Sequence, residues 1–92
     1  MPPIIVEAFV IDDINESKFW SHGLTREAVL QVLGNRRVVT RNRKGRAADY
    51  LVIGRDDRGR CIAIPIMPTH DPYGWRPITA WFCKPGEAAK LR

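Results

Sequence analysis

The sequence has few of the residues that hold metal ions or carry out redox chemistry. Cysteine occurs twice, at Cys61 and Cys83, in no metal-binding or redox spacing. The chain also lacks paired carboxylates, a phosphate-cradling glycine loop and a nucleophilic serine elbow. Metal-dependent, nucleotide-binding and serine-hydrolase sites are therefore unsupported. The sequence predicts no metal site and no cofactor.

Long apolar runs are absent as well. No stretch approaches the roughly 18 apolar residues that a membrane-spanning helix needs. The N-terminus has no basic leader before its apolar run, so we expect no secretion signal and a cytoplasmic protein. The cysteines are then most simply reduced, part-buried thiols. The sequence leaves open whether they form a disulfide, because both cysteines fall in predicted strands that could be neighbours.

Acidic residues are outnumbered by basic ones. Lys and Arg total 15 against 10 Asp and Glu, which gives a formal charge of +5 and a pI near 9.8. Such a surface attracts polyanions, of which nucleic acid is the commonest. The length of 92 residues and the 45% hydrophobic content predict one domain, residues 1–92, with a single modest core.

The first third of the chain predicts one strand and two short helices. Residues 4–11 are short and β-branched, which favours a strand buried on both faces. Asp13 with Glu16 three residues later predicts a capping box at the first helix, and Gly23 is expected to end it. Thr25 is expected to cap a second helix, which ends near residue 34.

Beyond residue 36 the pattern changes to strands. Residues 37–42, 50–55, 60–67 and 75–83 predict an antiparallel sheet, with a hairpin turn at "DDRG" where Gly59 can take a positive φ. Pro65 cannot donate to a ladder and predicts a sheet edge or a bulge. Residues 84–92 predict a short C-terminal helix. The whole order indicates an α+β fold, with the helices packed on a sheet of three to four strands.

The most basic stretch is "NRRVVTRNRKGR", residues 35–46. Its cations are Arg36, Arg37, Arg41, Arg43, Lys44 and Arg46. Within a strand, the side chains of residues 37, 39 and 41 share one face, so a row of guanidinium groups could contact successive phosphates. The alternative is a solubilising loop beside a charged edge strand. Arginine outnumbers lysine here, which favours phosphate binding.

Other candidate residues are scattered. His22 ends the first helix, where a positive charge is favoured by the helix dipole, and Lys18 lies one turn earlier. Arg55, Arg76 and Lys84 lie in or at the ends of predicted strands. His70 and Asp71 are neighbours in a turn-forming loop, where turn chemistry is the stronger interpretation. The aromatic residues Tyr73, Trp75, Trp81 and Phe82 fit either base stacking or the core.

Three segments together resemble a known family. The patterns "D..N..K...HGLT.E.V..VL", "Y..IGRD.RGR...I" and "WRPITAW..KPGE", which span residues 9–87, resemble the BrnT family. Members of this family are toxins of bacterial type II toxin–antitoxin pairs and share the RelE ribonuclease fold. The resemblance implies a RelE-like fold and a metal-independent endoribonuclease that cuts messenger RNA in the cytoplasm. It also implies an inhibiting antitoxin of the ribbon-helix-helix class.

The resemblance suggests site residues. Arg55, His22, Lys18 and Lys84 would be catalytic, and Arg37, Arg41, Arg43, Lys44, Arg46 and Arg76 would hold the RNA. The family commonly has an arginine where this chain has Trp81. Three alternatives follow: Lys84 could take the place of that arginine, base stacking on Trp81 could have become more important, or RNA cleavage could be lost. A non-catalytic interaction module is the alternative function, and a homodimer is possible.

Overall fold

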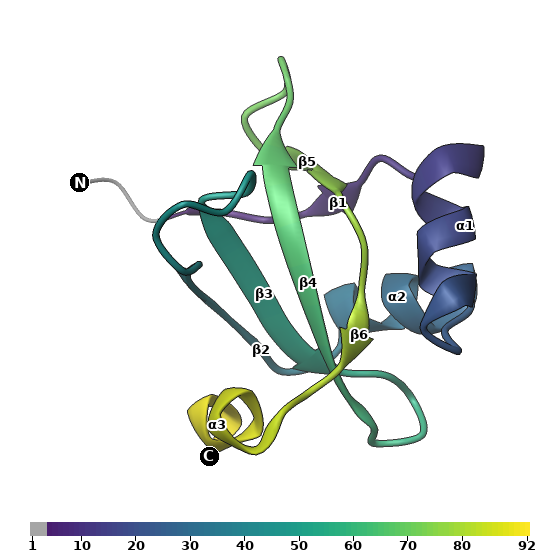
Figure 1. Ribbon diagram of the computed structural model, residues 1–92, viewed down its shortest axis with the longest axis vertical. Helices are drawn as coiled ribbons and strands as arrows, with labels where there is room; N and C mark the ends of the chain where they lie inside the picture. Colours follow the sequence, from purple (N-terminus) through teal and green to yellow (C-terminus); the bar gives the residue numbers. More distant parts are fainter. Residues whose placement is uncertain (1–3) are drawn as a thin grey trace.

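Two long strands, β3 (Tyr50–Arg55) and β4 (Cys61–Pro68), form the centre of the fold in the computed structural model, which describes residues 4–92 (Figure 1). They pair antiparallel, with Arg55 opposite Cys61. The turn between them contains Gly59 at φ 80°. The hairpin predicted from the "DDRG" turn is therefore confirmed.

The sheet has six strands in the order β1-β5-β4-β3-β2, and β6 pairs with β4 off this path. Its shorter strands are β1 (Ala8–Phe9), β2 (Arg37–Arg41), β5 (Gly74–Pro77) and β6 (Trp81–Phe82). The predicted α+β class is confirmed. The sheet is larger than the three to four antiparallel strands expected, and it is mixed, because β1 runs parallel to β5.

The N-terminal segment is not the strand predicted for residues 4–11. Only Ala8 and Phe9 pair, and burial alternates instead of being continuous: Val6 and Phe9 are buried whereas Ile5 and Val10 are exposed. The segment runs along one end of β5, held by the backbone hydrogen bond from the Val10 N–H to the Trp75 carbonyl. Its β-branched composition therefore reflects an edge with one buried face.

Helix α1 (Asp13–Ser21) begins one residue earlier than predicted. The N-cap is Asp12, whose Oδ1 accepts hydrogen bonds from the N–H groups of Ile14 and Asn15, and Asn15 completes the capping box. The expected pair of Asp13 and Glu16 was wrong by one position. The reason is tertiary: the buried Asn15 amide donates to the carbonyls of Val10 and Pro77, and these long-range bonds fix the start of the helix.

Helix α2 (Arg26–Gln31) follows the predicted break. Gly23 has φ 79°, a conformation that glycine adopts without steric cost, and Thr25 caps α2 by accepting from the Ala28 N–H. The short 3₁₀ helix η1 (Val32–Gly34) completes this helical pair. Leu24 and Val29 are both fully buried, at the two positions of a hydrophobic staple around the Thr25 cap. These predictions are confirmed.

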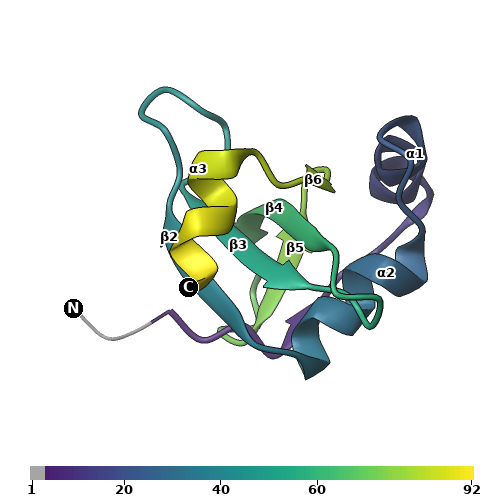
Figure 2. The same cartoon turned by 90° about the horizontal axis from the view of Figure 1, so that it is seen from below.

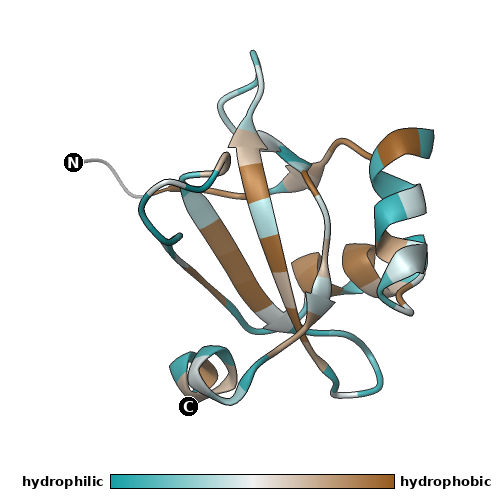
Figure 3. Cartoon of the chain, viewed as in Figure 1, coloured by the Kyte–Doolittle hydropathy of each residue, from teal (hydrophilic) through white to brown (hydrophobic). Residues whose placement is uncertain are grey.

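The central strands separate two apolar clusters. One side of β3 and β4 packs through Val52, Ile62, Ile64 and Ile66 against α1 and α2. The other side, including Leu51 and Ile53, packs against Leu91 of the C-terminal helices, α3 (Pro85–Ala88) and η2 (Ala89–Leu91). Figure 2 shows α2 and α3 on opposite sides of the sheet, and Figure 3 shows apolar residues concentrated along β3 and β4. None of the helices in residues 4–92 is long and apolar enough to cross a membrane.

Pro65 lies inside the sheet, not at an edge or in a bulge as predicted. Its carbonyl accepts a hydrogen bond from the Ile78 N–H. The N–H and C=O positions of one strand residue point to the same side, so the donor that proline lacks would also point to this side of β4. On that side the neighbouring chain is broken between β5 and β6, which pair with different parts of β4. The single last strand predicted for residues 75–83 is therefore two short strands, separated where a ladder donor is absent.

Cys61 and Cys83 form a disulfide, which corrects the expectation of reduced thiols. Cys83 directly follows β6, and its N–H donates to the Cys61 carbonyl. This pairing places the two Cα atoms 5.2 Å apart, within the range that a disulfide spans. Structural disulfides are typical of oxidising compartments, so the two cysteines no longer support a cytoplasmic location.

The ion pair between Asp12 and Arg76 predicts an acid-sensitive stability. The Arg76 guanidinium, assisted by the Asn15 N–H, lowers the pKa of Asp12 from 3.8 to about 2. Since the folded-state pKa is the lower one, ionised Asp12 stabilises the fold at neutral pH, and this contribution is lost as pH falls from about 4 to about 2. Asp12→Asn keeps a good helix cap and removes the ion pair. In urea denaturation, the stability difference between the wild type and this variant should shrink across that window, whereas Asp13→Asn should leave the Asp12 titration unchanged. A difference that stays constant with pH would contradict the role of the ion pair.

The disulfide predicts a redox-dependent stability. It joins residues 22 positions apart, and closing a loop of that length stabilises a fold by about 3 kcal/mol in the chain-entropy model. Adding a phosphine reductant should therefore lower the urea midpoint of the wild-type protein. The double variant Cys61→Ala/Cys83→Ala should have a low midpoint with or without reductant. Two free thiols titrating in the unreduced, denatured protein would show that the bridge does not form.

Candidate functional site

The candidate residues lie on two separate surfaces at opposite edges of the sheet. The basic tract follows β2, which is one edge, whereas β6 lies on the other side of β4. We name the first surface the basic edge, which comprises Arg36, Arg41, Arg43, Lys44 and Arg46. We name the second the aromatic corner, which comprises His22, Arg60, Trp81, Phe82 and Lys84.

The aromatic corner forms where the end of α1 meets β6. A Cβ atom on Gly23 would lie 3.9 Å from the Phe82 ring, which shows how closely the helix end approaches this strand. His22, the C-cap residue of α1, places its ring 6.5 Å from the Trp81 ring, measured between centroids, in an edge-to-face arrangement. The histidine whose role the sequence left open therefore faces an indole from a distant part of the chain.

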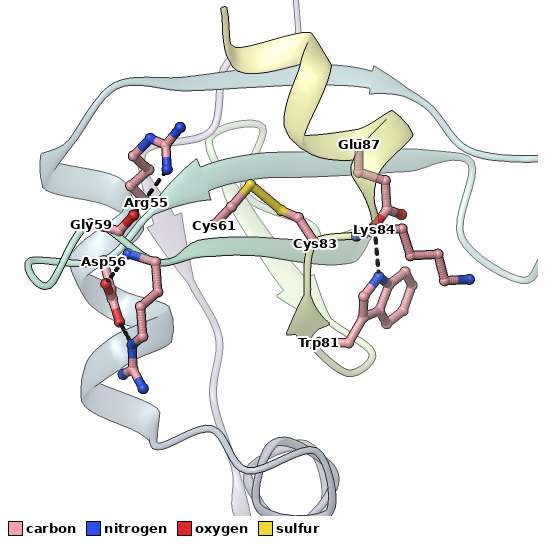
Figure 4. The surroundings of a disulfide bond; sticks show 9 residues. Arg55, Asp56, Gly59, Cys61, Trp81, Cys83, Lys84 and Glu87 are labelled. Carbon is pink, nitrogen blue, oxygen red and sulfur yellow. Dashed lines mark hydrogen bonds and ion pairs between the residues drawn. A yellow bond between two sulfur atoms is a disulfide. The ribbon is translucent and has the colours of Figure 1, made fainter.

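Glu87 fixes the other side of the corner. Its Oε1 accepts hydrogen bonds from the Trp81 indole N–H at 3.0 Å and from the Lys84 backbone N–H at 2.8 Å. In Figure 4, Lys84 and Trp81 lie on the same side of the disulfide. One carboxylate oxygen thus orients the indole and the segment that carries the lysine.

Arg60 supplies a cation on the other face of β6, since the side chains of Trp81 and Phe82 alternate along that strand. Its guanidinium lies over the Phe82 ring at 5.2 Å, and Phe82 is 41% exposed. The Arg60 Nε also pairs at 2.7 Å with the buried carboxylate of Asp56. Burial opposes the charge on Asp56, but hydrogen bonds from the backbone N–H and side chain of Arg60 outweigh it and hold the pKa of Asp56 below its usual value.

Arg55, a predicted catalytic residue, lies apart from this contact. Arg55 donates to the Gly59 carbonyl in its own turn, and in Figure 4 it extends on the opposite side of the disulfide from Trp81. Lys18 lies one turn before His22 on α1, and its side chain has no hydrogen bond among those of the described residues. The structure therefore places His22 against Trp81, links Lys84 to Trp81 through Glu87, and leaves Arg55 elsewhere.

The predicted RNA-binding residues divide into two groups. Arg37 donates to the carbonyls of Leu33 and Val6, and Arg76 pairs with Asp12, so both connect elements of the fold. The other four, Arg41, Arg43, Lys44 and Arg46, belong to the basic edge. None of these four takes part in an ion pair among residues 4–92.

The cations that the sequence offers as candidates do not gather into one patch. Arg41 pairs with Tyr50 and Arg55 follows Gly54, so the two arginines lie at opposite ends of β3. Side chains alternate along a strand, and this places Arg41 on the α1–α2 side of the sheet and Arg55 on the α3 side. No single phosphodiester could contact both.

Two further candidates, Asp71 and Trp75, have structural roles. The Asp71 carboxylate accepts a hydrogen bond from the Tyr73 N–H, and the Asp71 N–H donates one to the Thr69 hydroxyl. These are the turn-forming hydrogen bonds that the sequence favoured. Trp75 is buried against Tyr50, and its indole donates to the Ile5 carbonyl. Within residues 4–92, no three His, Cys, Asp or Glu side chains lie close enough to hold a metal ion.

Sequence reasoning missed three residues of the site: Asp56, Arg60 and Glu87. The spacing of Asp56 and Arg60 around a glycine turn was a usable signal, because a hairpin places such residues opposite one another. Glu87 follows Pro85 by two residues at the start of a helix, where a carboxylate bonds back to the preceding N–H groups. Its bond to Trp81 had no sequence signal.

Comparisons of the chain with protein-family models, with curated proteins and with solved structures found no match. The resemblance to the BrnT family therefore stays a prediction. The geometry of the two surfaces carries the functional argument.

Asp56 provides a test of how the corner is held. Asp56→Asn leaves a neutral acceptor for the Arg60 guanidinium, and hydrogen bonds to charged groups contribute about 1.5–3 kcal/mol each. We expect the free energy of unfolding, from urea denaturation, to fall by about 2 kcal/mol. Asp57→Asn is the matched control, since Asp57 is exposed in the same turn and should change stability by less than about 0.5 kcal/mol. Equal effects of the two variants would remove Asp56 as the anchor of Arg60.

Proposed function

We propose that this protein binds single-stranded RNA at the aromatic corner and cleaves it without a metal ion, as an endoribonuclease toxin would. The observation that carries the proposal is the contact between His22 and Trp81, whose indole shares the Glu87 carboxylate with the Lys84 backbone N–H. These residues come from two distant segments of the chain. Their combination matches the needs of RNA cleavage.

The chemistry uses the RNA's own 2′-hydroxyl. The neutral His22 imidazole accepts the proton of that hydroxyl while its oxygen bonds to the adjacent phosphorus. The bond from phosphorus to the 5′-oxygen breaks, that oxygen takes up a proton from water, and the protonated His22 releases its proton to solvent. The products are a 2′,3′-cyclic phosphate and a 5′-hydroxyl end. Lys84 would neutralise the extra negative charge on the phosphorus oxygens.

The aromatic side chains would hold the substrate. Phe82 is 41% exposed and Trp81 is half-buried, so each offers part of a ring face to an unpaired base. Stacking of a base on an aromatic ring contributes about 1–3 kcal/mol and tolerates any base. This arrangement favours single-stranded RNA over a duplex, whose bases are already stacked.

In this proposal the toxin acts in a type II pair. An antitoxin, of the ribbon-helix-helix class by resemblance to the BrnT family, would inhibit it by binding the toxin directly. A homodimer is compatible with the same function. No cofactor is needed for the chemistry described.

A second function, a non-catalytic RNA-binding module, is favoured by one observation. The position where the BrnT family commonly has an arginine is Trp81, and Arg55 extends away from the corner. Such a module would keep the stacking surface and the cations but would leave bound RNA intact.

The test compares the chain's two histidines. In a chelating buffer, the wild-type protein should cut a short single-stranded RNA, and His22→Gln should slow cleavage by about 100-fold or more, the contribution of a general base. His70→Gln is the matched control, because His70 lies in the loop before β5 and should leave the rate unchanged. The products are identified by the cyclic phosphate at their 3′ ends.

Binding is measured in parallel with the same sequence made as DNA, which lacks the attacking hydroxyl. An RNA that binds the wild type but is never cut would favour the non-catalytic module. Equal rates for the two histidine variants would exclude His22 as the base.

A further inference from the structure

The basic edge includes β2, an edge strand that is paired on one side only within the described part of the chain. β2 pairs only with β3 among the strands of residues 4–92, with Arg37 opposite Gly54 and Arg41 opposite Tyr50. The Asn42 N–H donates to the Asp49 carbonyl at the next position of this ladder. In an antiparallel pair the bonded positions alternate, so Val38 and Thr40 bond to β3. The backbone N–H and C=O groups of Arg37, Val39 and Arg41 therefore point outward.

A groove lies along this free edge. It has a volume of about 790 Å³ and is lined by Ile4, Val6, Arg36, Val39, Arg41 and Tyr50, among others. Its far wall is the extended N-terminal segment, which is fixed by the hydrogen bonds from Arg37 to the Val6 carbonyl and from Trp75 to the Ile5 carbonyl. A second hollow of about 410 Å³ continues from Arg41 along Arg43 and Lys44. The groove is thus pre-formed and elongated.

The groove combines three kinds of recognition element. Outward backbone groups offer hydrogen bonds at every second residue, as a partner strand requires. Aliphatic side chains, Val39 among them, form part of its lining. Cations border it, and the sequence has no acidic residue from 35 to 48. We propose that β2 accepts an acidic, extended peptide segment of a partner protein, which adds to the sheet as a further strand.

The lining favours a peptide over RNA. The aromatic ring in the groove, Tyr50, is already covered by the Arg41 guanidinium at 5.7 Å and packs edge-on against Trp75. It is therefore less available for base stacking than the rings of the aromatic corner. A second copy of this chain is disfavoured too, because two such edges would bring their cations together.

This proposal does not rest on RNA cleavage, since it concerns the opposite edge of the sheet. A peptide bound at β2 would leave His22 and Trp81 uncovered. The proposed function and the proposed partner site can therefore fail independently.

The test uses a fluorescent eight-residue peptide in which Glu alternates with Val, and measures its binding by anisotropy. The matched probe has the same sequence with N-methyl groups on alternate residues, which removes backbone donors and keeps every charge. If the peptide pairs with β2, N-methylation on the residues facing it should weaken binding by about tenfold or more. Equal binding of both probes, or no binding of the unmethylated one, would overturn the proposal.

Protein variants locate the site. Val39→Pro removes an outward N–H that β3 does not use, and should weaken peptide binding by about fivefold or more. Val39→Ala keeps that N–H and should bind more tightly than the proline variant. Circular dichroism verifies that each variant is folded, and the N-methylated probe still decides the question if the proline variant is not. Displacement of the peptide from β2 by an oligouridylate, without sensitivity to N-methylation, would assign this edge to RNA instead.

Discussion

The register of β3 against β4 determines where every functional side chain lies. With Arg55 opposite Cys61, residues 50, 52 and 54 face α1 and α2, while residues 51, 53 and 55 face α3. A shift of one residue would exchange these faces and expose the isoleucines and valines that form both clusters. The turn holds this register through Asp56, whose carboxylate accepts hydrogen bonds from the backbone N–H groups of Arg58 and Arg60. The same carboxylate positions the Arg60 side chain, so the turn links the stability of the sheet to the geometry of the aromatic corner.

Much of the fold was predictable because the local signals agreed. The "DDRG" turn, the Thr25 cap and the Gly23 break each lie where local chemistry places them. The errors occurred where distant contacts override local preference. Asn15 bonds to the Pro77 carbonyl and thereby moves the cap from Asp13 to Asp12. The segment 4–11 looked like a central strand because composition alone does not tell an edge from the middle of a sheet.

The candidate site was less predictable than the fold. His22 and Lys84 could be named from residue type and position, but their common neighbour Trp81 was noted only as a departure from the BrnT pattern. The basic tract looked like part of the same surface because it dominates the charge. Sheet order places it at the other edge, and order among short strands leaves no reliable trace in sequence.

The disulfide joins the start of β4 to the residue after β6, so β5 and the loop before it lie inside a covalent ring. A protease that cut once within this loop would produce two pieces that stay linked through sulfur. Such a nicked protein would keep its sheet partners in place and would separate into fragments only after reduction.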